Sequence, residues 1–349
     1  MTAPSAWFRR MSRLLASLAV AFLAVATPPA EAEDAAAFYK GRTVRLVVGY
    51  GAGGGYDAYA RQLAPHLEKR LGATVVVENR TGAGGLLALN QLAAGEPDGL
   101  SIMLVNGEGA ALAQLLGEEG VRYDLMKLPW LGRVSTEAGV VLLGPRLPYR
   151  TLADAAAATE RIRWGAGGKT DSLGDRAAVL SHALGLNSKI ILGYKGANEA
   201  ALAAIQGEVD AIVVSAGTAG KFVRDGTMTA AAVMDRERSP LLPDVPTVFE
   251  AADLSPEAAW WLDFRAKVGE IGRALITTPG VPDDRVQFLR AVAAAMLADP
   301  AVVAEGDGTG RPIEYAAATE LRELIRQTLE TLDSAKLAEV RSVLLEKYY

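Results

Sequence analysis

A glycine-rich turn limits the folds open to this chain more than any other segment. The stretch 44–57 reads VRLVVGYGAGGGYD, a β-prone apolar run followed by glycines at 51, 53, 54 and 55. The apolar run is typical of a buried parallel strand. The glycines permit backbone conformations that side chains would forbid. From Ala58 the pattern repeats at intervals of three and four residues, so the segment predicts a strand, a glycine turn and a helix.

The amino end of such a helix favours small anions. The first backbone N–H groups of a helix have no intrahelical acceptor, and the helix dipole adds partial positive charge there. Two further predicted strands, 74–77 and 101–105, also end in polar loops that contain glycine. Loops at the carboxyl ends of strands gather at one edge of an open α/β sheet, where ligands bind. The sequence therefore predicts an anion site at that edge.

A similar pattern returns in the second half of the chain. A short predicted strand, 161–164, leads into GAGGKTDSLGD at 165–175 and then into a helix. A cleft between two domains would then have an anion-binding backbone on each wall. The hydroxyls of Thr170 and Ser172 can donate to a carboxylate and also cap the helix. Asp57 is expected to cap the first helix or to accept a hydrogen bond from a ligand.

Three later segments carry expectations of their own. Residues 239–247 are rich in proline and suit a return crossing between domains. Residues 258–275 are predicted to be mostly helical, with a strand at Trp260, Trp261 and Phe264 as the alternative. The tail, 319–349, has leucines at helical spacing and is predicted to pack over the first domain.

Composition excludes several classes of function. The 349 residues include no cysteine, so disulfides, thiolate catalysis and cysteine metal sites are excluded. The only histidines, His66 and His182, lack metal-ligand spacing, and we expect neither a metal site nor a catalytic histidine. The net charge of −5 gives no support to nucleic-acid binding.

The amino terminus resembles an export signal. Arginines at 9, 10 and 13 precede an apolar core at 14–25, and Ala30-Glu31-Ala32 fits a cleavage site. We therefore expect residues 1–32 to be removed and the mature protein to be periplasmic. Arg9 and Arg10 resemble a twin-arginine signal, but their flanking residues fit that pattern poorly, and we favour the general secretory route. Cleavage would remove three arginines and one glutamate, which takes the charge from −5 to about −7.

The pattern Gly49-x-Gly51-x-x-Gly54 also matches a dinucleotide fingerprint, with Glu78 where a ribose-binding acid is expected. An exported oxidoreductase is therefore the alternative. Against it stand the export signal, the additional glycine flexibility and the lack of a histidine or cysteine acid–base pair. We favour a ligand loop, with no cofactor and no catalytic residues.

Five segments together resemble one receptor family. They are VRLVVGYGAGGGYDAYAR, VVVENRTGAGG, GYKGANEAALAAIQGEVDAIV, RSPLLPDVPTVFEA and TTPGVPDDRV, in that order. In this combination, from about Tyr39 to about Pro312, the chain resembles the substrate-binding proteins of tripartite tricarboxylate transporters, the Bug-type periplasmic receptors.

The resemblance implies a type II periplasmic-binding-protein fold, with two α/β domains, a ligand cleft between them and two crossing segments. Residues 33–132 plus 248–349 would form domain 1, and residues 133–247 domain 2. The family's ligand loops carry over onto Gly53, Gly54, Gly55, Tyr56 and Asp57; Asn106, Gly107 and Glu108; Gly167, Gly168, Lys169, Thr170, Asp171 and Ser172; and Ser215, Ala216 and Gly217. Tyr56 and the segment 214–217 depart from the family pattern and bear on the shape of the pocket.

The resemblance also implies a function. The protein would capture a small organic acid with a carboxylate group and deliver it to the membrane permease subunits of a tripartite tricarboxylate transporter, acting as a monomer. A sensor that passes the ligand signal to another partner is a further alternative, because both functions use the same domain closure.

Overall fold

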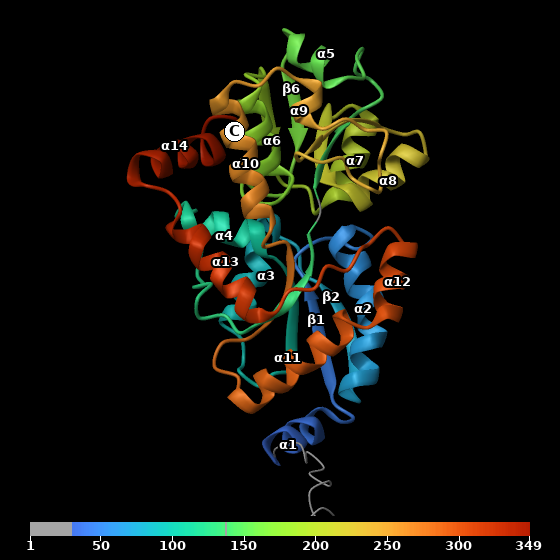
Figure 1. Ribbon diagram of the computed structural model, residues 1–349, viewed down its shortest axis with the longest axis vertical. Helices are drawn as coiled ribbons and strands as arrows, with labels where there is room; N and C mark the ends of the chain where they lie inside the picture. Colours follow the sequence, from blue (N-terminus) through green and yellow to red (C-terminus); the bar gives the residue numbers. More distant parts are fainter. Residues whose placement is uncertain (1–29, 137) are drawn as a thin grey trace, which may run out of the picture.

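The computed structural model describes residues 30–136 and 138–349, and the expected signal segment before Ala30 falls outside them. The chain folds into two α/β lobes stacked along the long axis (Figure 1). Each lobe is built on one five-stranded sheet. We call the lobe that contains the first sheet the first lobe and the other the second lobe. The mixed α/β architecture agrees with the expected fold class.

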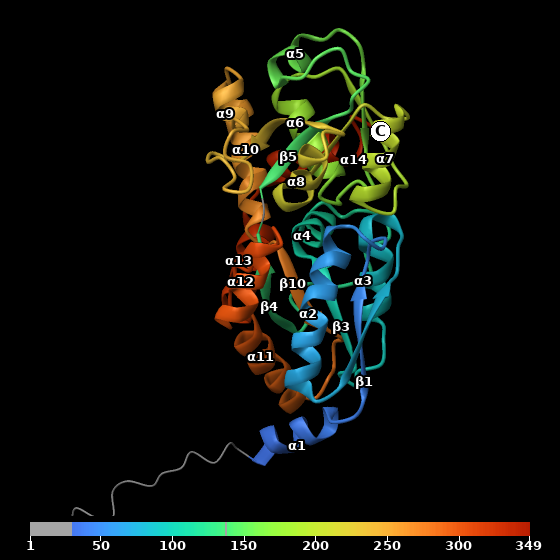
Figure 2. The same ribbon diagram turned by 90° about the vertical axis from the view of Figure 1, so that its right-hand side faces the viewer.

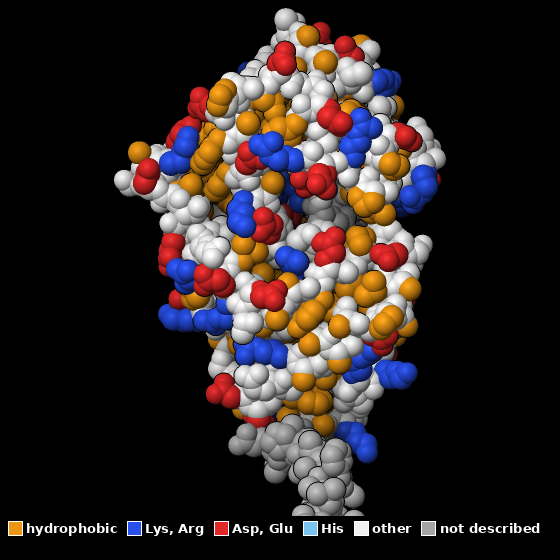
Figure 3. Space-filling model, in the orientation of Figure 1, with side chains coloured by type: hydrophobic (Ala, Val, Ile, Leu, Met, Phe, Trp, Pro, Cys, Tyr) orange, Lys and Arg blue, Asp and Glu red, His pale blue; other side chains and the backbone are white. Residues whose placement is uncertain are grey.

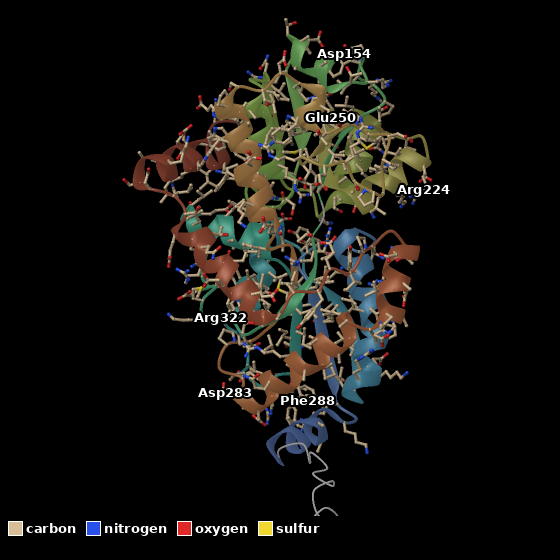
Figure 4. All side chains as sticks on the ribbon, viewed as in Figure 1. Asp154, Arg224, Glu250, Asp283, Phe288 and Arg322 are labelled. Carbon is tan, nitrogen blue, oxygen red and sulfur yellow. The ribbon has the colours of Figure 1, made fainter. Side chains whose placement is uncertain are left out.

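The first sheet forms from apolar runs that lie far apart in the sequence. In spatial order its strands are β2 (Thr74–Asn79), β1 (Thr43–Val48), β3 (Ser101–Asn106), β10 (Arg273–Thr277) and β4 (Trp130–Ser135). Strands β2, β1 and β3 are parallel, and β10 is antiparallel to both of its neighbours. Its helices are α1 (Ala30–Tyr39), α2 (Gly55–Leu71), α3 (Leu86–Ala93), α4 (Gly107–Leu115), α11 (Asp283–Leu297), α12 (Pro300–Gly308) and α13 (Ala318–Glu330), with a 3₁₀ turn, η1 (Ala83–Gly85). Phe288 of α11, labelled in Figure 4, stacks on Tyr39 and so fixes α1 to the far end of this lobe.

The second sheet repeats the same plan. Its strands, in spatial order, are β7 (Ser188–Ile191), β6 (Ile162–Gly165), β8 (Ala211–Ser215), β5 (Gly139–Leu143) and β9 (Thr229–Met234). Strand β5 is antiparallel to both neighbours, as β10 is in the first sheet. Its helices are α5 (Leu152–Ala157), α6 (Gly174–Ala183), α7 (Ala197–Gln206), α8 (Ala216–Arg224), α9 (Val248–Ala251) and α14 (Ser334–Leu345).

Within the described residues, three short segments cross between the lobes (Figure 2). The first joins β4 to β5, the second joins α10 (Pro256–Gly269) to β10, and the third joins α13 to α14. The prediction that residues 239–247 form the return crossing is wrong, because Thr247 forms a bridge with Val233 of β9 and so stays on the second lobe. The prediction of helix through Leu275 is also wrong, because the helix ends near Gly269 and β10 follows. Gly272, at φ +61°, makes the bend that separates the two elements.

The carboxyl-terminal helices divide between the lobes. Helix α13 packs on β4 and α4 of the first lobe, as the tail prediction expected. Helix α14 instead packs on α6, and its buried residues Val340 and Leu344 join the core of the second lobe. Helix α9 also lies against β9. The domain bounds themselves, 33–132 plus 248–349 and 133–247, stay a prediction.

One bent helix pair has membrane-like length and composition. Among the described residues no single helix is both long enough and apolar enough to cross a membrane. Helices α11 and α12, which are bent by 59° at their junction, meet these criteria only when they are taken together.

Candidate functional site

A cavity lies where the two lobes meet. Its lining comes from both lobes and consists of Tyr50, Gly54, Gly55, Tyr56, Glu108, Ser172, Leu173, Arg176, Ala197, Val214, Ser215, Thr218 and Arg273. Most of these residues lie at the amino ends of five helices, namely α2, α4, α6, α7 and α8. Because each such end carries partial positive charge, the cavity suits an anion. Acidic and basic side chains lie side by side on the surface around this junction (Figure 3).

The first glycine turn presents the amino end of α2 to the cavity. Gly54 and Gly55 line it, and Gly53, at φ +77°, makes the bend. The Gly53 N–H donates to Asp57 Oδ2 at 2.7 Å, and Arg61 Nε donates to the same oxygen at 2.9 Å. Burial alone would raise the pKa of Asp57, but these hydrogen bonds outweigh it and lower the pKa. Asp57 therefore holds the turn in shape and is not among the residues that line the cavity.

The second glycine turn is organised in the same way, around Asp171. Its carboxylate accepts hydrogen bonds from the backbone N–H groups of Gly167, Gly168, Leu173 and Gly174, at 2.7 to 3.1 Å. Burial raises the pKa of Asp171 to about 6, and the four N–H groups oppose that shift. These N–H groups are thus bound to the protein's own carboxylate. The turn therefore offers the cavity the hydroxyl of Ser172. The four backbone N–H groups that bind Asp171 are not offered to a ligand.

Two residues of the second turn point to other partners. Lys169 Nζ donates to the carbonyl oxygen of Leu345 at 2.7 Å and lies 5.1 Å from the centre of the Tyr349 ring. The Thr170 hydroxyl donates to the carboxylate of Glu118 in the first lobe. The side chains of Lys169 and Thr170 therefore fasten the turn to the terminal segment and to the first lobe.

A buried ionic cluster forms one wall of the cavity. Glu108 of α4 accepts hydrogen bonds from Arg176 of α6 at 3.2 Å and from Arg265 of α10 at 2.9 Å. Ser172 Oγ donates to the other oxygen of Glu108 at 2.7 Å. Arg265 Nε also donates to Asp175 at 2.7 Å. Each of these four charged residues is at most 5% exposed to solvent. Together they connect the first lobe, the second lobe and helix α10.

The pKa values of the two acids in this cluster shift in opposite directions. Burial alone would raise the pKa of Glu108, but the charges of Arg176 and Arg265 outweigh it and lower the pKa to about 2. For Asp175, burial outweighs the opposing charge of Arg265, and the neighbouring Glu108 adds to it, which raises the pKa to about 7. Glu108 is therefore the ionised carboxylate of the cluster at neutral pH.

A second part of the cavity lining is aromatic. The rings of Tyr50 and Tyr56 stack with their centres 4.6 Å apart. The guanidinium of Arg273, the first residue of β10, lies 5.0 Å from the Tyr56 ring centre and 4.7 Å from that of Tyr59. This wall joins a cation to a flat apolar surface.

The remaining expected site residues are placed as follows. The side chain of Asn106 caps α4 by accepting from the Gly109 N–H and donates to the Tyr50 hydroxyl. Ser215 lines the cavity, and its Oγ lies 3.1 Å from that of Thr218. Gly107, Gly167, Gly168, Ala216 and Gly217, together with Gly53, Asp57, Asn106, Lys169, Thr170 and Asp171, are not among the residues that line the cavity.

The lobes touch closely beside the cavity. The Gly51 N–H donates to the carbonyl oxygen of Lys195, in the second lobe, at 2.7 Å. At Gly168 an added Cβ atom would lie 3.0 Å from backbone atoms of Ala83 and Gly84 in the first lobe. The structure is thus a closed form, in which glycines permit the contact.

Sequence reasoning missed several lining residues, of which Arg176, Arg273 and Thr218 are polar. Arg176 lies in α6, a few residues after the second glycine turn, and Thr218 lies in α8, three residues after Ser215. Arg273 lies within the segment 258–275, which the sequence pattern predicts to be mostly helical. The β-prone residues of IGRALIT, 271–277, are the signal that could have located this strand.

One group of possible metal ligands lies outside the cavity. His182, Glu257 and Glu339 have ligand atoms within 4.8 Å of one another. Lys347 Nζ lies 3.0 Å from His182 Nδ1, and Lys336 Nζ lies 2.8 Å from Glu339 Oε2. Lysine side chains thus already contact two of these three residues.

Comparison with known proteins gives a consistent family assignment. The family model described as the tripartite tricarboxylate transporter family receptor matches residues 59–331. The protein BugT of Bordetella pertussis is 29% identical over 267 residues, which are 74% of this chain and 80% of BugT.

Solved structures agree with this match. The periplasmic binding protein BugD has a TM-score of 0.75 and 27% identity, covering 88% of this chain and 99% of BugD. MatC of Rhodopseudomonas palustris, solved with bound malate, has a TM-score of 0.70 and 23% identity, covering 86% of this chain and 99% of MatC. The similarity to MatC shows a shared fold.

Proposed function

The chain belongs to the tripartite tricarboxylate transporter family of receptors, and on that basis we propose that its interlobe cavity captures a small organic acid through a carboxylate group. The family and its solved relatives are solute-binding receptors, so the chain is a receptor and not an enzyme. The dinucleotide-binding alternative is thereby set aside. Its fingerprint glycines 51 and 54 form the ligand turn, and Glu78 pairs with Arg80 at 2.6 Å.

The single observation that carries the proposal is the convergence of helix amino ends from both lobes on one cavity. The first turn of α2 supplies backbone N–H groups at Gly55 and Tyr56. Ser215 and Thr218 of the second lobe supply hydroxyls. A carboxylate that contacts both sets binds the closed form better than an open one, so binding favours closure. The bound malate of MatC supports an acid as the ligand.

We further propose how the receptor acts in the cell. It is exported to the periplasm with cleavage near Ala32, acts as a monomer and delivers its ligand to the permease subunits of a tripartite tricarboxylate transporter. The family assignment supports the export and the transporter partnership. The predicted cleavage position lies in the first turn of α1.

A side chain placed in the cavity tests the proposal. A Cβ atom added at Gly55 would lie 2.9 Å from Thr218 Oγ1 and 3.8 Å from Arg273, so Gly55→Leu fills the cavity. We expect calorimetric titration with mono-, di- and tricarboxylates to find a ligand for the wild type and at least a tenfold loss of affinity for Gly55→Leu, about 1.4 kcal/mol or more.

Gly308→Leu is the matched control. Gly308 is also helical, and an added Cβ atom there meets nothing within 4 Å. We expect its affinity to equal that of the wild type. A wild type that no carboxylate stabilises or binds, or a Gly55→Leu variant that binds normally, would contradict the proposed site.

A further inference from the structure

Glu108 places a carboxylate of the protein itself inside the ligand cavity. It comes from α4 in the first lobe, and both of its oxygens accept hydrogen bonds from groups beyond that lobe. One oxygen accepts from Ser172 and Arg176, and the other accepts from Arg176 and Arg265. Glu108 thus makes the contacts across the lobes that an external acid would be expected to make.

The donors of this wall are arranged around Glu108. Ser172 is the hydroxyl that the second glycine turn presents to the cavity, and it donates to Glu108 at 2.7 Å. Arg176 is the cation that α6 presents there, and it also donates to Glu108. A ligand carboxylate brought to this wall would lie beside an ionised carboxylate and would compete for the same donors. Such like-charge contact in a site of low dielectric is unfavourable.

The rest of the cavity lining has two parts, a region that suits an anion and a surface that is mainly apolar. The anion region lies at the amino ends of α2 and α8, near Arg273. Tyr50, Leu173 and Val214 supply apolar and aromatic surface elsewhere in the lining. A ligand with one carboxylate and an apolar body matches both parts.

From this arrangement we propose that Glu108 is a specificity-determining residue that makes the receptor select small monocarboxylates with an apolar chain or ring over the corresponding dicarboxylates. The inference rests on the proposed function and narrows its substrate class. Glu108 occupies the place of a second ligand carboxylate and repels one that approaches.

Matched pairs of acids test the selection directly. Butanoate and succinate have the same chain length, as do hexanoate and adipate, and each pair differs in one terminal carboxylate. We expect the wild type, titrated calorimetrically, to bind the better monocarboxylate at least tenfold more tightly than its matched dicarboxylate.

Removing the resident carboxylate should reverse the preference. In Glu108→Ala the space beside Arg176 and Arg265 is open to a second ligand carboxylate, which can accept the same hydrogen bonds. We expect the affinity for the matched dicarboxylate to rise at least tenfold while the affinity for the monocarboxylate does not rise. Glu108→Gln keeps the volume and removes the charge, so the gain for the dicarboxylate should be smaller.

Glu118→Ala is the control variant. Glu118 also bonds across the lobes, to Thr170, but it is not among the residues that line the cavity. Its acid preference should match that of the wild type. A wild type that prefers the dicarboxylates, or a Glu108→Ala variant that folds and keeps the wild-type preference, overturns the inference and leaves the receptor function standing. Failure to bind any member of either pair or any other carboxylate overturns the proposed function itself. If neither Glu108 variant folds, the wild-type pairs alone decide.

Discussion

Asp175 shows how burial sets the behaviour of single residues in this protein. Its carboxyl is fully buried between α6 and α10, and it faces Arg265, Glu108 and Arg176. Burial raises its pKa from 3.8 to about 7. Between these two values the folded state keeps a proton that the unfolded state releases. Raising the pH from about 4 to about 7 therefore destabilises the folded state through this residue.

Asp175→Asn tests this titration, because asparagine resembles the protonated acid and cannot ionise. We expect the melting temperature of the wild type, measured relative to that of the variant, to fall as the pH rises from 4 to 7. Thermal unfolding of both proteins at matched pH values measures the difference. A difference that stays constant or grows over that range would contradict the raised pKa.

At the scale of residues, the sequence pattern predicts where the glycine turns lie but not which partners their side chains contact. Gly54, Gly55, Tyr56, Glu108, Ser172 and Ser215 were expected at the ligand and line the cavity. Lys169 and Thr170 were expected there too, but their partners Leu345 and Glu118 lie far away in the sequence. Which donor a side chain meets depends on tertiary contacts that a local pattern does not encode.

At the scale of elements, α10 links the two lobes through buried charge. Its residue Arg265 donates to Glu108 of α4 and to Asp175 of α6. Arg265→Met keeps much of the apolar stem but leaves two buried carboxylates without this cation. Removing one partner from a buried ion pair costs about 3–5 kcal/mol, and we expect a loss of unfolding free energy of that size. Chemical denaturation measures it.

The matched comparison is Arg236→Met. Arg236 pairs with Asp263 of α10 at 2.7 Å, but the two side chains are 63% and 43% exposed. Solvent screens such a pair, so we expect little or no change in stability. Equal losses of unfolding free energy in the two variants would show that the buried ion pairs of Arg265 stabilise the fold no more than the exposed pair of Arg236.

Element boundaries followed the sequence where the local pattern was strong. The apolar runs of β1 and β3 lie close to their predicted positions. Strand β10 was missed because its residues follow a helix and are also acceptable in one. Its pairing between β3 and β4 is a long-range contact that overrides local preference.

At the scale of the whole molecule, function depends on closure of one lobe on the other. The contact between Gly168 and the backbone of Ala83 and Gly84 exists only when the lobes meet. Gly168→Ala should hold them slightly apart, since an added Cβ atom would lie 3.0 Å from that backbone. We expect at least a tenfold loss of ligand affinity, with little change in the melting temperature of the ligand-free protein.

Gly308→Ala serves as the reference for this substitution, because its added atom meets nothing within 4 Å. Small-angle scattering follows closure itself. Addition of ligand should reduce the radius of gyration of the wild type more than that of Gly168→Ala. Equal affinity and equal compaction in both variants would show that this contact does not limit closure.

The most direct test of the account is a crystal structure of the receptor grown with the carboxylate that binds it best. We predict a carboxylate in the interlobe cavity, at roughly 2.7–3.2 Å from the N–H groups of Gly55 or Tyr56 and from a hydroxyl of Ser215 or Thr218. An acid held by one lobe alone, or bound outside this cavity, would contradict the central claim that both lobes grip one ligand.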